Sequence, residues 1–243
     1  RMFLDVRVQL NKPGRSFIED PQLGATGAKS TQVGIMGDII QITEHEVTLQ
    51  LEISASAPIE KLEIRNGLKV LETVRPYKPT ELGKRIRVIW SGAEYRGRGR
   101  ETVWDGSASI NGNTIETISQ VNMYNLEKTV TQLDRSRLEW KAVTTGGFGG
   151  FDCVLADPQA GTLTIKTAQV NCTVPVAEIG FHETRIDAGG LDRHLRLERL
   201  PDTNPHLQLS LERKIAMNSS GDNPLYVCVT QEDGHQAWSS PIY

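Results

Sequence analysis

The stretch Val47-Thr48-Leu49-Gln50-Leu51-Glu52-Ile53 alternates strictly between apolar and polar side chains. Successive side chains of a β-strand point to opposite faces, so this pattern predicts a strand with one buried face and one solvated face. Strands of this kind are typical of antiparallel sheets, whereas parallel sheets are built from continuous apolar runs.

The same period of two recurs along the chain, in segments 86–90, 163–165, 195–197, 207–211 and 225–229. About a dozen short strands with very little helix predict an all-β protein made of antiparallel β-sandwiches. The best helical candidate is segment 124–138, where apolar residues lie at near-helical spacing; an ordered loop is the alternative reading.

Several short segments carry turn signals. Asn66-Gly67 and Asn111-Gly112 each lie between apolar residues, and Asn-Gly tolerates positive φ, so both predict tight hairpins. Segment 232–235 (EDGH) predicts a hairpin tip rather than a corner that binds Ca²⁺. The glycine-rich segment 144–150 (TTGGFGG) predicts a flexible loop rather than a phosphate cradle.

Composition narrows the possible partners. The formal net charge of the 243 residues is -3, which argues against nucleic acid or an anionic membrane as a partner. We expect no membrane span, because no stretch approaches the roughly 20 apolar residues that one requires. Cys153, Cys172 and Cys228 are far apart and form no CxxC pair, so we predict reduced cysteines, with Cys228 in a strand.

No convincing catalytic or metal-binding centre emerges from the motifs. His182, His194 and His206 are evenly spaced but include no close pair, which favours solvent-facing strand residues over metal ligands. Asp152 and Asp157 are predicted at strand ends. The chain has no G-x-S-x-G, P-loop or dinucleotide fingerprint, so we predict neither catalytic residues nor a cofactor for this chain.

Segment 90–106, WSGAEYRGRGRETVWDG, is the most unusual part of the sequence. Arginine forks bind phosphate or carboxylate, and aromatic rings stack on sugars or bases. The segment is therefore a candidate site for a glycan or an anionic small molecule, with these residues: Tyr95, Arg96, Arg98, Arg100, Trp104 and Asp105. In the alternative interpretation the aromatic rings seal a sandwich edge, and the arginines pair with Glu94, Glu101 and Asp105.

Four stretches carry a family resemblance: 57–67 (APIEKLEIRNG), 90–107 (WSGAEYRGRGRETVWDGS), 144–152 (TTGGFGGFD) and 223–243 (NPLYVCVTQEDGHQAWSSPIY). They resemble the C-terminal region of a bacterial domain-of-unknown-function family associated with the PHP superfamily of metal-dependent phosphoesterases. A PHP site is similar to a cluster built on H-x-H, which this chain lacks, so no catalytic residue is carried over. The resemblance implies a divalent metal only in a domain upstream of Arg1, and that catalytic-type domain of the same polypeptide as the partner.

The resemblance also implies a topology. Residues 35–81 and 222–243 would form a discontinuous Ig-like sandwich, and 82–221 a larger, jelly-roll-like sandwich inserted into it. Residues 1–34 would be an N-terminal strand and a connecting segment from the preceding domain. The function expected is that of a non-catalytic accessory region. The alternatives are a carbohydrate- or anion-binding module, and a jelly-roll hydrolase whose carboxylate pair the sequence does not locate.

Overall fold

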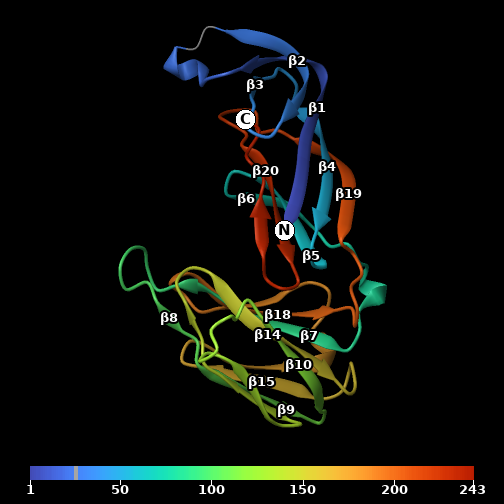
Figure 1. The fold of residues 1–243 in the computed structure, drawn as a ribbon, viewed down its shortest axis with the longest axis vertical. Coiled ribbons are helices and arrows are strands. Elements are labelled where there is room, and N and C mark those ends of the chain that lie inside the picture. Colours follow the sequence, from blue (N-terminus) through green and yellow to red (C-terminus); the bar gives the residue numbers. More distant parts are fainter. Residues whose placement is uncertain (25–26) are drawn as a thin grey trace. The chain divides into compact units, whose positions relative to one another are not determined.

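The computed structural model describes residues 1–24 and 27–243 (Figure 1). Apart from three short 3₁₀ turns, the regular elements in these residues are β-strands, and the sheets are antiparallel. The prediction of an all-β sandwich protein is confirmed. The chain divides into two compact units: unit 1 is Arg1–Pro76 with Pro205–Tyr243, and unit 2 is Tyr77–Asn204.

Unit 1 contains two sheets. The larger has the order β19-β4-β1-β2, with β3 also paired to β1, and the smaller has the order β21-β20-β5-β6. The elements are β1 (Met2–Phe17), η1 (Pro21–Leu23), β2 (Ala28–Ile35), β3 (Ile39–Gln41), β4 (Glu46–Ala55), β5 (Ile59–Asn66), β6 (Lys69–Val74), β19 (Gln208–Ala216), β20 (Leu225–Gln231) and β21 (Gln236–Trp238).

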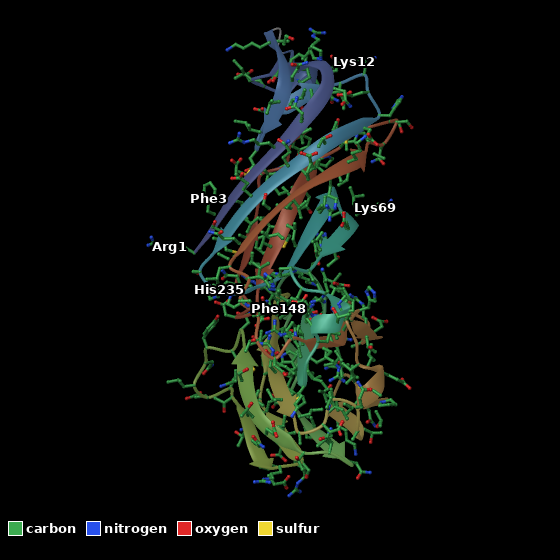
Figure 2. The ribbon with its side chains drawn as sticks, turned by 90° about the vertical axis from the view of Figure 1, so that its right-hand side faces the viewer. Arg1, Phe3, Lys12, Lys69, Phe148 and His235 are labelled. Carbon is green, nitrogen blue, oxygen red and sulfur yellow. The ribbon has the colours of Figure 1, made fainter. Side chains whose placement is uncertain are left out.

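The core of unit 1 lies between these sheets and follows from the alternation. The apolar residues of β4 are buried together with Val6 and Val8 of β1 and with Val227 and Val229 of β20. Phe3 of β1 has the opposite orientation and points into solvent (Figure 2). Since the apolar face of each sheet covers that of the other, the unit is a sandwich.

The two strands that pair with β4 show which parts of the chain belong to unit 1. On one side β4 pairs with β1, from Met2↔Ala55 to Gln9↔Thr48, and on the other with β19. Residues 1–34, expected to come largely from a preceding domain, thus include a central strand of unit 1. Residues 205–221, expected in the inserted sandwich, supply its edge strand β19. The pairing of β20 with β5 completes the second sheet.

Two predicted hairpins are present in unit 1. Asn66↔Lys69 closes the β5–β6 hairpin, so its two turn residues are Gly67 and Leu68, and the first of them has a positive φ (57°) that glycine tolerates. Segment 232–235 joins the paired strands β20 and β21, as expected for a hairpin tip. Cys228 is a buried strand residue, as predicted, and burial raises the pKa of its thiol to about 11. The three cysteines are free.

Unit 2 contains two five-stranded sheets, β10-β14-β7-β18-β17 and β11-β12-β9-β15-β16, and the short pair β13-β8. Its elements are η2 (Pro79–Glu81), β7 (Arg85–Ala93), β8 (Thr102–Val103), β9 (Gly106–Asn111), β10 (Ile115–Val121), β11 (Val130–Asp134), β12 (Arg137–Trp140), β13 (Val143–Thr144), β14 (Phe148–Leu155), β15 (Thr162–Thr167), β16 (Asn171–Pro175), η3 (Val176–Glu178), β17 (Thr184–Asp187) and β18 (Leu191–Leu200).

Aromatic rings fill the centre of the unit 2 core. Trp90 of β7 stacks on Trp140 of β12, with ring centroids 5.2 Å apart and an interplanar angle of 5°. Phe151 of β14 packs against both indoles. Because Trp90 and Trp140 belong to different sheets, this stack joins the two layers of the sandwich.

Three local predictions for unit 2 are wrong. Asn111-Gly112 does not form a hairpin: β9 pairs with β12 and β15, whereas β10 pairs with β14 in the other sheet. Segment 124–138 is not a helix but contains β11 and the start of β12, which pair with each other. In segment 144–150, Gly149 and Gly150 are buried in β14. A β-carbon on Gly150 would lie 2.1 Å from the carbonyl oxygen of Val88, so strand pairing requires glycine there.

No helix in the described part of the chain is long and apolar enough to cross a membrane.

Candidate functional site

Four of the six candidate residues lie on one exposed loop of unit 2, between β7 and β8. Tyr95, Arg96, Arg98 and Arg100 are all exposed. The loop is closed by a hydrogen bond from the Glu94 N–H to the Arg100 carbonyl oxygen (3.3 Å). Gly97 and Gly99 both have positive φ, and the Tyr95 phenol oxygen lies over Gly99, 2.6 Å from where a β-carbon would be. The glycines therefore allow a tight turn that carries three cations on its rim.

The expected ion pairs of this loop are not formed. Glu94 pairs with Arg193, and an Asp105 oxygen accepts the Ala142 N–H at 2.9 Å. Within the described residues, the side chains of Arg96, Arg98 and Arg100 make no hydrogen bond or ion pair. Their guanidinium groups are thus available to an anion.

The other two candidate residues, Trp104 and Asp105, do not belong to the exposed loop, because their side chains make contacts that stabilise the fold. Trp104 is fully buried; its Nε1–H donates to the Thr144 hydroxyl at 2.8 Å, and its carbonyl accepts the Trp140 Nε1–H at 2.6 Å. Thr144 in turn donates to the Gly92 carbonyl at 2.7 Å. With no ring face exposed, Trp104 is placed as a core residue rather than as a stacking platform.

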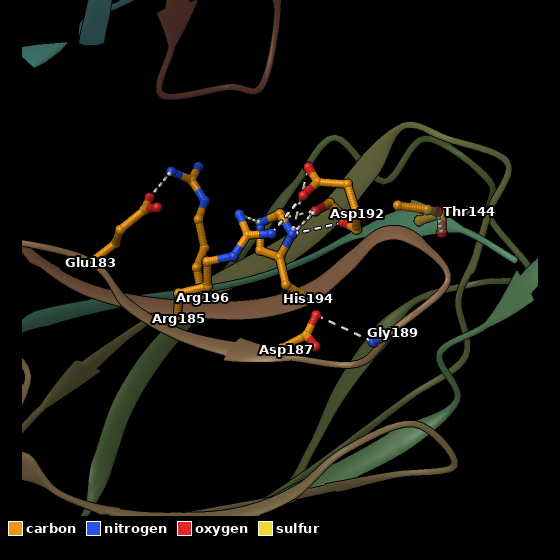
Figure 3. A network of polar contacts seen from close by, with 10 residues as sticks. Thr144, Glu183, Arg185, Asp187, Gly189, Asp192, His194 and Arg196 are labelled. Atoms are coloured by element: carbon orange, nitrogen blue, oxygen red, sulfur yellow. Dashed lines mark hydrogen bonds and ion pairs between the residues drawn. The ribbon is translucent and has the colours of Figure 1, made fainter. Parts of the chain in front are cut away.

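A second polar cluster, not predicted from the sequence, lies on β7 and β18 (Figure 3). His194 pairs in register with Ser91, and the Ser91 Oγ lies 3.2 Å from Nδ1 and 3.1 Å from Nε2 of the imidazole. His194 is only 8% exposed, so its prediction as a solvent-facing residue is wrong. This burial lowers the pKa of His194 below its ordinary value of 6.5 because the charged imidazolium is poorly solvated.

Hydrogen bonding assigns the tautomer of His194. Nδ1 lies 2.8 Å from the Asp192 carbonyl oxygen, which can only accept, so the proton is on Nδ1. Nε2 is then the acceptor, and an Arg185 N–H lies 3.4 Å from it. Figure 3 shows Arg185 and Asp192 beside the ring. Ser91 and His194 thus have the residue types of a nucleophile and its base.

The carboxylate beside His194, that of Asp192, does not have the position that it would have in a catalytic triad. In such a triad a carboxylate accepts the Nδ1–H and orients the imidazole. Here the Asp192 carboxylate is 3.9 Å from Nδ1 and accepts instead from Arg185 at 2.6 Å. Arg185 also contacts Nε2, the atom that would have to take the serine proton. The cluster is therefore organised as a cross-strand polar contact.

Next to this cluster, the same sheet face carries a row of buried charges. Asp152 of β14 lies opposite Arg87 of β7 and accepts two hydrogen bonds from its guanidinium, at 2.7 and 2.9 Å. The buried Arg196 lies within 3.3 Å of the buried Glu198 and within 3.4 Å of the exposed Glu183, both measured between side-chain N and O atoms. Asp152 is mid-strand, so its predicted place at a strand end is wrong.

The histidines are not gathered at a metal site. His206 belongs to unit 1, whereas His182 and His194 belong to unit 2. His182 is exposed and makes an edge contact with Phe181. In the described residues, no group of three or more His, Cys, Asp or Glu side chains has the geometry to hold a metal ion.

Comparisons with protein-family models, with curated proteins and with solved structures gave no match to this chain. They do not test the resemblance to the PHP-associated family, which stays a prediction.

Proposed function

We propose that this chain is a non-catalytic β-sandwich accessory region. The observation that carries the proposal is the arrangement of His194. Its Nδ1–H is held by a backbone carbonyl, and the Asp192 carboxylate, 3.9 Å from Nδ1, is held by Arg185. The Ser91–His194 pair is thus bound into the cross-strand contacts of its own sheet.

The parent protein is the second part of the proposal. On the resemblance of the four sequence stretches, the parent is a larger, PHP-like metal-dependent hydrolase whose metal is bound by its catalytic domain. Within this proposal unit 1 is Ig-like and unit 2 is jelly-roll-like. The sandwiches would act as a partner of that catalytic domain.

Hydrolase assays test the accessory role. The chain alone and the full gene product would be assayed on p-nitrophenyl phosphate and bis-p-nitrophenyl phosphate, with added Mn²⁺. We expect turnover by the full product and none by the chain. Turnover by the chain that disappears in Ser91→Ala and His194→Gln, both still folded by circular dichroism, would show that the cluster is catalytic and refute the proposal.

Binding of a small anion is a second candidate function, favoured by the three arginines of the 94–101 loop, which have no partner among the residues that the structure describes. Arginine forks bind phosphate and sulfate bidentately, and Tyr95 (52% exposed) offers a ring beside them. Isothermal titration with inorganic phosphate, glucose 6-phosphate and glucose tests this function. Arg98→Ala should weaken phosphosugar binding while the exposed Arg135→Ala leaves it unchanged. Flat titrations with all three ligands would end the binding hypothesis.

A further inference from the structure

Unit 1 contains a cavity of about 520 Å³ that no part of the proposed function uses. Its lining comes from β1, β3, the 42–45 segment, the 217–223 segment and the last residues of the chain, with one residue each from η1, β4 and β20. All of these segments belong to unit 1. The volume lies in the range of about 300–1,000 Å³ that is typical of small-molecule sites in proteins.

The floor of the cavity is apolar. Val8, Leu10, Val47, Leu225 and Ile242 line it, and each is a buried member of the unit 1 core. The half-buried Ile40 and Met217 extend this surface toward solvent. An apolar wall at a solvent-connected cavity favours an apolar ligand, because ligand and wall both lose contact with water on binding.

Hydrogen bonds hold the walls of the cavity in place. The Met217 N–H donates to the His45 carbonyl at 2.9 Å, and the Ile40 N–H donates to the Tyr243 carbonyl at 2.6 Å. The Asn223 side-chain oxygen accepts from the Asn66 side-chain amide and from the Asn218 N–H, both at 2.8 Å. The segments on both sides of the opening are therefore fixed before any ligand arrives, which lowers the entropic cost of binding.

The ionised side chains at the rim are acidic. Glu44 and Asp222 line the cavity, and the described lining residues include neither lysine nor arginine. One Glu44 oxygen accepts the Asn11 N–H at 3.0 Å, which orients the carboxylate, and Asp222 is exposed at the opening. A ligand with a positive head group matches this rim, whereas an anionic head group would face two carboxylates.

We propose that this cavity binds a small amphipathic cation, with an alkyl or aryl body on the apolar floor and an ammonium-type head between Glu44 and Asp222. The proposal does not depend on the accessory role of the chain, because it rests on the cavity in unit 1, whereas the accessory role rests on the contacts of His194 in unit 2.

The test uses probes matched in their tails. Octyltrimethylammonium, octanesulfonate and tetramethylammonium would be titrated into the full chain below their aggregation concentrations. The readouts are calorimetry and the methyl NMR signals of the methionines. Met217 lines the cavity and Met123 belongs to unit 2, so one chain supplies both the reporter and its internal control.

We expect octyltrimethylammonium to bind with a stoichiometry of one, to shift the Met217 signal and to leave that of Met123 in place. The sulfonate should bind at least about tenfold more weakly, and tetramethylammonium should not bind. Asp222→Lys should weaken the cationic probe about fivefold or more, whereas Glu52→Lys, an exposed change on the outer face of β4, should not.

Met217→Trp should narrow the cavity and weaken binding of octyltrimethylammonium. If that variant does not fold, the exposed Asp222→Lys still decides the question. Equal affinity for the two octyl probes, an unshifted Met217 signal, or unchanged binding in Asp222→Lys would each overturn the proposal.

Discussion

Replacing Trp104 by phenylalanine separates a core role for this residue from a ligand-binding role. The change removes the Nε1–H that donates to the Thr144 hydroxyl at 2.8 Å, together with one ring of a side chain that is fully buried. The lost hydrogen bond costs about 1 kcal/mol. The unfilled space left by the smaller ring costs roughly 1–2 kcal/mol more.

The expected total is therefore about 2–3 kcal/mol lost from the free energy of unfolding of unit 2. For a unit of this size, about 4 °C of melting temperature corresponds to each kcal/mol, so its Tm should fall by roughly 10 °C. Differential scanning calorimetry and near-ultraviolet circular dichroism measure the change. Trp140 and Trp90, which lie in the same core, provide a spectroscopic signal of packing.

Arg98→Ala is the matched comparison, because its side chain is exposed and unpartnered among the described residues. Its free energy of unfolding should stay within about 0.5 kcal/mol of the parent chain. A Trp104→Phe variant as stable as the parent would refute the placement of the indole in the core. A large loss of stability in Arg98→Ala would refute the description of the Arg98 side chain as exposed and without a partner among the described residues.

Three further outcomes follow from unit 2. Asp152→Asn removes the negative charge that pairs with the buried Arg87 guanidinium, so urea denaturation should show a loss of about 3–5 kcal/mol from the free energy of unfolding. The Asp152→Leu/Arg87→Met double variant should be more stable than this single one. Gly150→Ala places a methyl group against a neighbouring carbonyl oxygen, so the variant should melt well below the parent or fail to fold in thermal scans. Because burial lowers the pKa of His194, the unfolded chain takes up the proton first as the pH falls below 6.5. The contribution of His194 to the free energy of unfolding should thus be constant above that pH and decrease between 6.5 and the lower pKa of the folded state. His194→Gln should flatten that decrease, and an unchanged pH profile would contradict the assignment.

The strands could be predicted because their signal is local. Alternation in the 47–53 segment reports which side chains face the core, whichever strand lies alongside. The Asn66-Gly67 hairpin could be predicted for the same reason, since turn and strands are contiguous. Asn111-Gly112 has the same local chemistry, but the partners of its two flanking strands come from distant parts of the chain. Only those long-range pairings assign the strands to different sheets.

The candidate site was predictable to a similar degree. Exposure of the arginines at positions 96, 98 and 100 follows from their glycine-interleaved loop. The burial of Trp104 depends on Thr144, forty residues later, and the burial of Asp152 depends on Arg87, sixty-five residues earlier. A charged residue in the polar phase of a strand looks solvent-facing until the opposite charge on the neighbouring strand is known.

The way unit 2 interrupts unit 1 has a consequence for synthesis on the ribosome. β4 and β5 are translated before unit 2, yet each keeps one unpaired edge until β19 and β20 have been translated. At about 5–20 residues per second, translation of the intervening unit 2 segment takes on the order of ten seconds. During that interval the nascent chain presents two open strand edges, the feature through which chains pair wrongly with one another. Rapid folding of unit 2 does not shorten this exposure, since only translation of the segment Pro205–Tyr243 can end it.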